Sequence, residues 1–316
     1  MKDDWNLGEF KEYNQTIGKV TKTILIYWVT FQVGALLISQ FMVNHAWLSG
    51  SNVAAVKNSG LPYFGAVAIS LFFVWTYVSP QLQKKILAPG RVKMTKFSFF
   101  TLVVTFILIQ LLLGIFDSVI EMVLNLFGYS ALEQLKQAVS SGTTWSMLAY
   151  SALLAPISEE LVFRGYLLRS LEKYGAKLAI VVSAAMFGLM HANIMQTPFA
   201  FCVGLILGYV AYNYGIVWSI ALHFCNNFVI GGVSDFLNNH WGNFGQYINL
   251  VINLAACVCA LVLLYSERQT IKDWLAQNKI RPGYIERAIF NLPMLLFIIV
   301  ITMVMFAGLT TINMMH

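Results

Sequence analysis

Two adjacent carboxylates and an arginine stand close together in a chain that is otherwise very apolar. Glu159, Glu160 and Arg164 lie in the segment 159–165, which reads EELVFRG. Only 11% of the 316 residues are charged, whereas 58% are hydrophobic, and the mean hydropathy is +0.69. Acids beside membrane-spanning segments are energetically costly, so this pair requires a functional or structural reason.

The spacing of these charges predicts different tasks for the two acids. On a helix, Glu160 and Arg164 are four residues apart and share a face, whereas Glu159 is turned by about 100° from Glu160. One carboxylate can therefore pair with the arginine and stay ionised, while the other can act as a general base. The structural alternative is an acidic helix start followed by a cytosolic arginine.

Two further polar sites lie downstream within apolar segments. His191 follows Phe187 by one helical turn, and His223 precedes Asn227 by one turn on the same helix face. The imidazole and the amide of the second site can both donate hydrogen bonds toward one point, which suits a developing oxyanion or ligation of a metal. Single His and Asn residues in membrane helices more often serve as structural links, and Asn226 competes with Asn227 for either task.

Together these sites supply two carboxylates, an arginine, two imidazoles and an amide, which suffice for water-activating chemistry inside a membrane. The elements that must position them are transmembrane helices, because the hydrophobic fraction exceeds the roughly 45–50% of soluble chains. The apolar segments are long and do not alternate, so we expect an all-α, polytopic membrane helical bundle and not a β-barrel.

The net charge of +6 has a topological explanation. The basic residues fall in short loops between spans, without the aromatic-interleaved patch of nucleic-acid binders, so we expect a lipid bilayer and no nucleic acid as partner. The cysteines form no CxxC pair and are predicted to be small buried hydrophobic residues. They are Cys202, Cys225, Cys257 and Cys259.

The apolar segments predict eight or nine spans, several of them shorter than the ~20 residues of a straight crossing. Segment 117–143 is amphipathic and is expected to lie at an interface or to fold over the bundle. Ser158 is expected to start a new helix after Pro156, the alternative being one helix kinked at Pro156. The expected spans are 24–43, 61–79, 97–116, 144–157, 178–191, 198–213, 216–233, 247–265 and 289–312.

The chain divides into three predicted parts. N-terminal transmembrane helices with the amphipathic segment fill 1–143, a catalytic core fills 144–233, and C-terminal transmembrane helices fill 234–316. Basic loops alternate with nearly uncharged ones, which predicts a cytosolic N-terminus. The polar N-terminus lacks the features of a cleaved signal peptide. We therefore expect a multi-pass protein of the plasma membrane, and of a bacterial one.

The three polar sites resemble the signature of a protease family when they are taken in order. Glu-Glu-x-x-x-Arg from Glu159, Phe-x-x-x-His ending at His191 and His-x-x-x-Asn from His223 are similar to the motifs of the CPBP family. This family comprises the CAAX proteases and bacteriocin-processing enzymes, also called the Abi group of intramembrane proteases. The resemblance covers roughly residues 144–233.

The resemblance implies a role for each motif residue. In the family the first glutamate, here Glu159, activates water together with the histidine of the second motif, here His191. The third motif, His223 and Asn227, holds the oxyanion. Glu160 and Arg164 complete and orient the site. These six residues are the predicted catalytic set.

Metal dependence is left open by the residue types. Glu159, His191 and His223 could ligate Zn²⁺ and leave a position for water, which would make the enzyme a metalloprotease. A metal-free glutamate protease is equally compatible with these side chains.

The leading hypothesis from the sequence is an intramembrane endopeptidase that cleaves a membrane-proximal peptide or protein. CAAX cleavage itself requires prenylated partners, and no prenyl-binding feature is apparent, so it is less expected than the family name implies. Bacterial members of the family that the motifs resemble are linked to bacteriocin maturation, self-immunity or quorum-peptide processing. The alternative is a non-proteolytic membrane scaffold or bacteriocin self-immunity protein that binds a membrane partner. A transporter with a proton relay is a third interpretation, disfavoured because no internal repeat is present.

Overall fold

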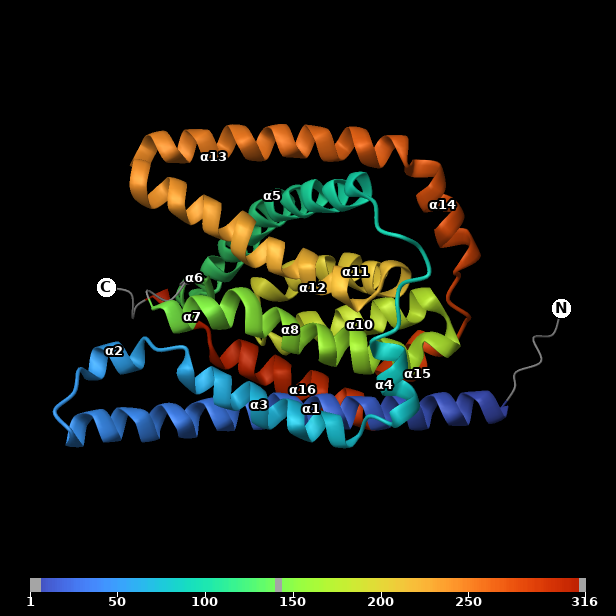
Figure 1. The fold of residues 1–316 in the computed structure, drawn as a ribbon, viewed down its shortest axis with the longest axis horizontal. Helices are drawn as coiled ribbons and strands as arrows, with labels where there is room; N and C mark the ends of the chain where they lie inside the picture. The colour runs from blue at the N-terminus through green and yellow to red at the C-terminus, as the bar shows by residue number, and fades with distance from the viewer. Residues whose placement is uncertain (1–6, 140–143, 313–316) are drawn as a thin grey trace.

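The computed structural model describes residues 7–139 and 144–312, which are almost entirely helical (Figure 1). The first helices are α1 (Leu7–Leu48), α2 (Val53–Lys57), α3 (Leu61–Thr76), α4 (Pro80–Ile86), α5 (Lys96–Leu126) and α6 (Leu132–Val139). The central ones are α7 (Trp145–Ala149), α8 (Ala155–Glu159), α9 (Arg169–Leu171), α10 (Ala176–Met190), α11 (Gln196–Tyr214) and α12 (Ile216–Phe224). The last are α13 (Gly232–Ser266), α14 (Arg268–Gln277), α15 (Tyr284–Ile289) and α16 (Leu292–Ala307).

Four short helical segments are wound differently from an α-helix, and two very short strands complete the described fold. The π-helical segments are η1 (Tyr150–Leu154), η2 (Glu160–Leu168) and η4 (Cys225–Gly231), and η3 (Glu172–Tyr174) is a 3-10 turn. Strands β1 (Tyr129–Ser130) and β2 (Thr310–Thr311) pair antiparallel.

The helices form one bundle whose long members run side by side (Figure 1). Seven helices of the described part are long and apolar enough to cross a membrane, and α10 and α16 are shorter apolar helices. Many large apolar side chains on the long helices are exposed, as expected where lipid is the solvent. The predicted all-α, polytopic bundle is confirmed.

The first helix is much longer than the predicted span 24–43, because α1 already begins at Leu7. Its N-terminal half has a buried stripe in which every third or fourth residue from Phe10 to Tyr27 packs into the main core. That periodicity is the signature of an amphipathic helix. The polar residues between these positions lower the average hydropathy and hide the helix from a search for apolar runs.

Segment 117–143 is not one interfacial element, so that prediction is wrong for its first ten residues. Helix α5 continues through Asp117 and Glu121 to Leu126, and only α6 is a separate short helix. Glu121 accepts hydrogen bonds from the Ser130 hydroxyl and from the Ala131 backbone N–H at 3.0 Å, which fixes the turn after α5. Residues 140–143 lie outside the described part of the chain.

The predicted helix start at Ser158 is also wrong, because the chain is helical without a break from Trp145 through Leu171. Pro156 lies within this helix, directly after the wide turn η1, and π-helical winding resumes in η2. Such winding relieves the clash between a proline ring and the preceding turn. The Ser158 hydroxyl donates to the Ala155 carbonyl at 2.9 Å and caps nothing. The alternative of one helix through Pro156 is thus correct.

Helices α10 and α11 form a tight antiparallel pair whose contact faces carry small residues. A Cβ atom placed on Gly204 would lie 3.1 Å from the Ala184 Cα atom, and one on Gly208 would lie 3.1 Å from the Ile180 side chain. Gly188 is tighter still, since a Cβ there would lie 2.8 Å from the Thr197 carbonyl oxygen. Small residues let membrane helices approach closely, and this pair carries His191 at its turn.

Replacing Gly188 by Ala is expected to destabilise the bundle by about 1–3 kcal/mol, because the backbone of α11 cannot yield to the added methyl group. The measurement is unfolding of the purified protein in detergent. Gly114→Ala in α5 is the matched control, since a Cβ there has no neighbour within 4 Å. Equal stability of the two variants would show that the α10–α11 contact is not close.

The turn between α10 and α11 is held by α6. The Gln134 side chain donates to the Ala192 carbonyl at 3.3 Å, and the Asn193 amide donates to the Gln134 carbonyl at 3.2 Å. Ala192 has a positive φ of 49°, which is uncommon for a residue with a side chain. The turn that follows His191 is thus held in a sparsely populated conformation by neighbouring elements.

Candidate functional site

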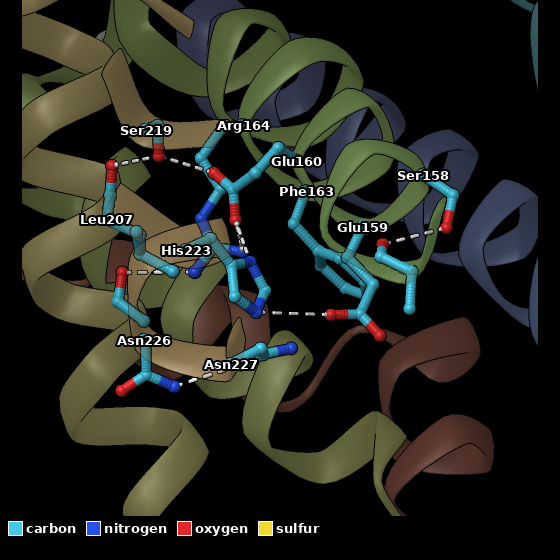
Figure 2. A network of polar contacts seen from close by, with 12 residues as sticks. Ser158, Glu159, Glu160, Phe163, Arg164, Leu207, Ser219, His223, Asn226 and Asn227 are labelled. Atoms are coloured by element: carbon cyan, nitrogen blue, oxygen red, sulfur yellow. Dashed lines mark hydrogen bonds and ion pairs between the residues drawn. The ribbon is translucent and has the colours of Figure 1, made fainter. Parts of the chain in front are cut away.

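Glu160 and Arg164 form a fully buried ion pair (Figure 2). Arg164 Nη1 lies 3.1 Å from Glu160 Oε1, and neither side chain has any exposed surface. Arg164 Nη2 donates to the Gly204 carbonyl at 3.3 Å, and the guanidinium carbon lies 4.2 Å from the centre of the Phe187 ring. The pairing predicted from the four-residue spacing is confirmed.

Two side chains of α12 complete the surroundings of the Glu160 carboxylate. His223 Nδ1 lies 3.0 Å from Glu160 Oε1, and the Ser219 hydroxyl donates to Glu160 Oε2. The Leu207 carbonyl, at 3.0 Å, is an alternative acceptor for the Ser219 proton. An ionised carboxylate only accepts hydrogen bonds, so the proton lies on His223 Nδ1 and the ring orientation is fixed. His223 Nε2 consequently faces away from Glu160.

Glu159 occupies the position toward which His223 Nε2 points. Its Oε2 atom lies 3.7 Å from that nitrogen, as the dashed line in Figure 2 shows. The Glu159 side chain keeps 17% of its surface exposed, whereas that of Glu160 keeps none. Of the two acids, only Glu159 is therefore accessible to water or to a substrate. The divergence of the two neighbouring carboxylates agrees with their expected separation around the helix.

His191 lies at the C-terminal end of α10 and belongs to the same neighbourhood through Phe187. Its Nδ1 lies 2.9 Å from the Phe187 carbonyl, which turns Nε2 outward. The His191 and His223 rings stand edge-on to the Phe187 ring, with ring centres 5.0 Å and 5.8 Å away from it. Within the described residues, no hydrogen bond joins His191 to Glu159, so the joint role of these two residues remains a prediction.

Asn227 lies in the π-helical segment η4, one turn after His223. Its amide donates to the Ser151 carbonyl at 3.1 Å and its side-chain oxygen accepts from Asn226 at 3.0 Å. Asn226 itself accepts from Gln110 of α5 at 3.1 Å. The Ser151 carbonyl uses one of the two N–H groups of the Asn227 amide, and Asn227 is exposed, so the second N–H group can donate to another acceptor.

The donor set for a metal can be tested against this geometry. Among residues 7–139 and 144–312, no three His, Cys, Asp or Glu side chains come close enough together to hold a metal ion. Glu159 and His223 approach each other, but His191 does not join them. The predicted zinc set of Glu159, His191 and His223 is therefore not assembled in this arrangement and remains a prediction.

Ser219 is a site residue that the motif analysis missed. It lies four residues before His223 on α12, is fully buried, and contacts the carboxylate that orients His223. The available signal was the spacing Ser-x-x-x-His-x-x-x-Asn, which places three polar side chains along one helix. That signal is weak because serine is common in membrane helices, where it usually bonds to its own backbone.

For the peptidase activity predicted from the sequence, Ser219→Ala is expected to reduce cleavage about tenfold while the protein stays folded, because Glu160 loses one of the groups that hold its carboxylate. The readout that separates positioning from folding is kcat against KM, since only kcat should fall. Ser219→Thr keeps the hydroxyl and should restore part of the activity. Unchanged kcat in Ser219→Ala would assign Ser219 to packing alone.

Comparison with known proteins agrees with the three motifs. No curated protein and no solved structure matches the chain. Residues 141–229 match the family model described as Type II CAAX prenyl endopeptidase Rce1-like. Glu159, Arg164, His191, His223 and Asn227 all lie inside the matched segment. The resemblance to the CPBP family is thereby confirmed for residues 141–229, which are similar to the CAAX proteases of the Rce1-like type.

Proposed function

We propose that the protein is an intramembrane endopeptidase that hydrolyses a peptide bond in a membrane-proximal peptide or protein. The family match supports protease activity in general. The observation that carries the specific proposal is the facing pair of Glu159 and His223. The partly exposed carboxylate of Glu159 faces Nε2 of His223. The other ring nitrogen of His223 contacts the buried carboxylate of Glu160, which is paired with Arg164.

In the proposed mechanism, Glu159 accepts a proton from a water molecule, and the resulting hydroxide attacks the carbonyl carbon of the scissile bond. His223 Nε2 and the Asn227 amide donate to the oxyanion, and Glu159 passes its proton to the leaving amine. His191 would hold the water from the side of α10. For this donation the His223 ring carries a proton on Nε2 as well as on Nδ1.

The proposal assigns residues 144–233 to the catalytic core, with transmembrane helices in 1–143 and 234–316. If the two shorter apolar helices also cross the membrane, they and the seven long ones make nine spans among the described residues. In Figure 1, α1 begins at the end of the bundle that carries α4, α14 and α15, and α16 ends at the opposite end. Of the predicted basic loops, 80–96, 266–287 and the part of 164–177 that follows the buried Arg164 gather at the first of these ends, which supports a cytosolic N-terminus. A bacterial plasma membrane is part of the proposal.

The function is tested with the full chain reconstituted in liposomes and offered peptides in H₂¹⁸O. The panel contains leader peptides, a membrane-anchored peptide and a prenylated CAAX peptide. Cleavage with one ¹⁸O in the new carboxyl terminus is expected, and a parallel incubation with a chelator decides whether a metal takes part. Full complementation of a deletion strain by Glu159→Gln, with no cleavage by the wild type, would assign the protein to the scaffold or self-immunity class.

A further inference from the structure

A basic cavity lies away from the catalytic site, at the end of the bundle where α1 begins. Its volume is about 320 Å³. Lys19 of α1, Lys85 of α4, Arg169 of α9 and Lys173 of η3 line it, so cations from separate parts of the chain converge on one space. Neutral polar side chains lie between them, including Tyr77 and Ser170.

The carboxylates near this cavity are too few to neutralise it. Glu172 is shared by three cations, with nitrogen–oxygen distances of 2.9 Å to Arg169, 3.4 Å to Arg91 and 3.6 Å to Lys85. Glu12 pairs with Lys173. Four cations therefore share two carboxylates, and Lys19 adds a fifth positive charge.

Lys19 is the one cation of this cavity that has no carboxylate partner among the described residues. It is exposed, and it makes no ion pair with any residue of the described chain. The Lys85 and Lys173 side chains are 57% and 51% exposed. Water can therefore solvate their ammonium groups when these move away from their present carboxylate partners. Arg169, by contrast, is buried and held by Glu172 and the Ala211 carbonyl, so it supplies fixed positive charge at the floor.

The depth of the cavity in the membrane follows from the ends of the spans around it. One apolar span ends at Thr76 and another at Tyr174, and both ends border the cavity. Trp75 and Tyr77 are exposed next to it, as aromatic residues at the headgroup level commonly are. Basic pockets between helices at this level suit anionic lipid headgroups.

We propose that this cavity binds the phosphate group of an anionic phospholipid. The three lysines donate to the phosphate oxygens, Arg169 contributes its charge from below, and the acyl chains extend along the apolar outer surface of α3. A free phosphate ion would carry the same charge, but it has no apolar part to hold at this depth. The proposal is independent of the proteolytic function.

The test uses the full-length protein in neutral detergent and a fluorescent phosphatidylglycerol, whose binding is followed by anisotropy at constant ionic strength. Unlabelled phosphatidylglycerol should compete at least tenfold better than phosphatidylcholine with the same acyl chains. Lys19→Gln/Lys85→Gln/Lys173→Gln should lose at least tenfold in affinity, since each lysine near a lipid surface contributes about fivefold. Lys11→Gln/Lys84→Gln/Lys93→Gln, which removes equal charge from exposed sites, should bind like the wild type.

Three results would overturn the proposal. An equal loss of affinity in both triple variants would mean that the overall charge of the protein attracts the lipid and that no specific site exists. If inorganic phosphate competes as effectively as phosphatidylglycerol, the occupant of the cavity is a soluble anion and not a lipid. If the triple variant does not fold, the single variant Lys19→Glu decides, because Lys19 has no ion pair to lose; unchanged affinity in that variant would also reject the site.

Discussion

Glu159→Gln is expected to lower peptide cleavage by about 10²–10⁴-fold, the usual contribution of a positioned general base. Glutamine has nearly the same shape as glutamate but cannot take a proton from water. The neighbouring Glu160 cannot replace it, because that carboxylate is fully buried and is already bonded to Arg164, His223 and Ser219. The defect should lie in kcat, since substrate binding does not depend on proton transfer.

The measurement is initial cleavage rate in liposomes at equal amounts of inserted protein. Glu286→Gln is the matched control, because Glu286 is exposed on α15 and makes no ion pair in the described structure. The two variants should unfold at the same temperature as the wild type. Full turnover by Glu159→Gln would remove Glu159 as the base and with it the proposed mechanism.

Part of this site follows from local helix geometry and could therefore be read from the sequence. The Glu160–Arg164 pair and the divergence of Glu159 depend only on residue spacing within one helix, and both appear in the structure. The membrane class follows from composition. The predicted helix start at Ser158 is wrong because the wide turns that accommodate Pro156 leave no recognisable pattern in the amino-acid sequence.

The convergence of different helices could not be predicted in the same way. Which acid meets which histidine depends on how α12 packs against the helix of residues 145–171, and the structure places His223 between Glu159 and Glu160. The joint action of His191 and Glu159 that the family motifs imply stays a prediction. The contact that the structure shows is that of both imidazoles with the Phe187 ring. Interhelical contacts are set by side-chain packing over the whole interface, and a short sequence motif does not contain that information.

Arg164→Met is expected to destabilise the protein by about 3–5 kcal/mol, because it leaves Glu160 charged and without its cation in the core. Glu160→Gln/Arg164→Met should recover much of this loss, since the buried charge is then removed with its partner. Lys136→Met is the control, because its pair with Glu133 is largely exposed and should contribute less than about 1 kcal/mol. Reversible unfolding in mixed detergent micelles measures all three variants.

The activity of the double variant then shows what the buried pair is for. The single oxygen of an amide at position 160 can accept from His223, while its NH₂ group donates to the Ser219 hydroxyl, whose proton then goes to the Leu207 carbonyl. The amide no longer provides the negative charge beside the His223 ring. A stable and inactive double variant is therefore the expected result, and it would separate the electrostatic task of Glu160 from its structural one. A double variant as unstable as Arg164→Met would contradict the argument, because the loss would then arise from the missing arginine contacts to Gly204 and Phe187 and not from an unpaired charge.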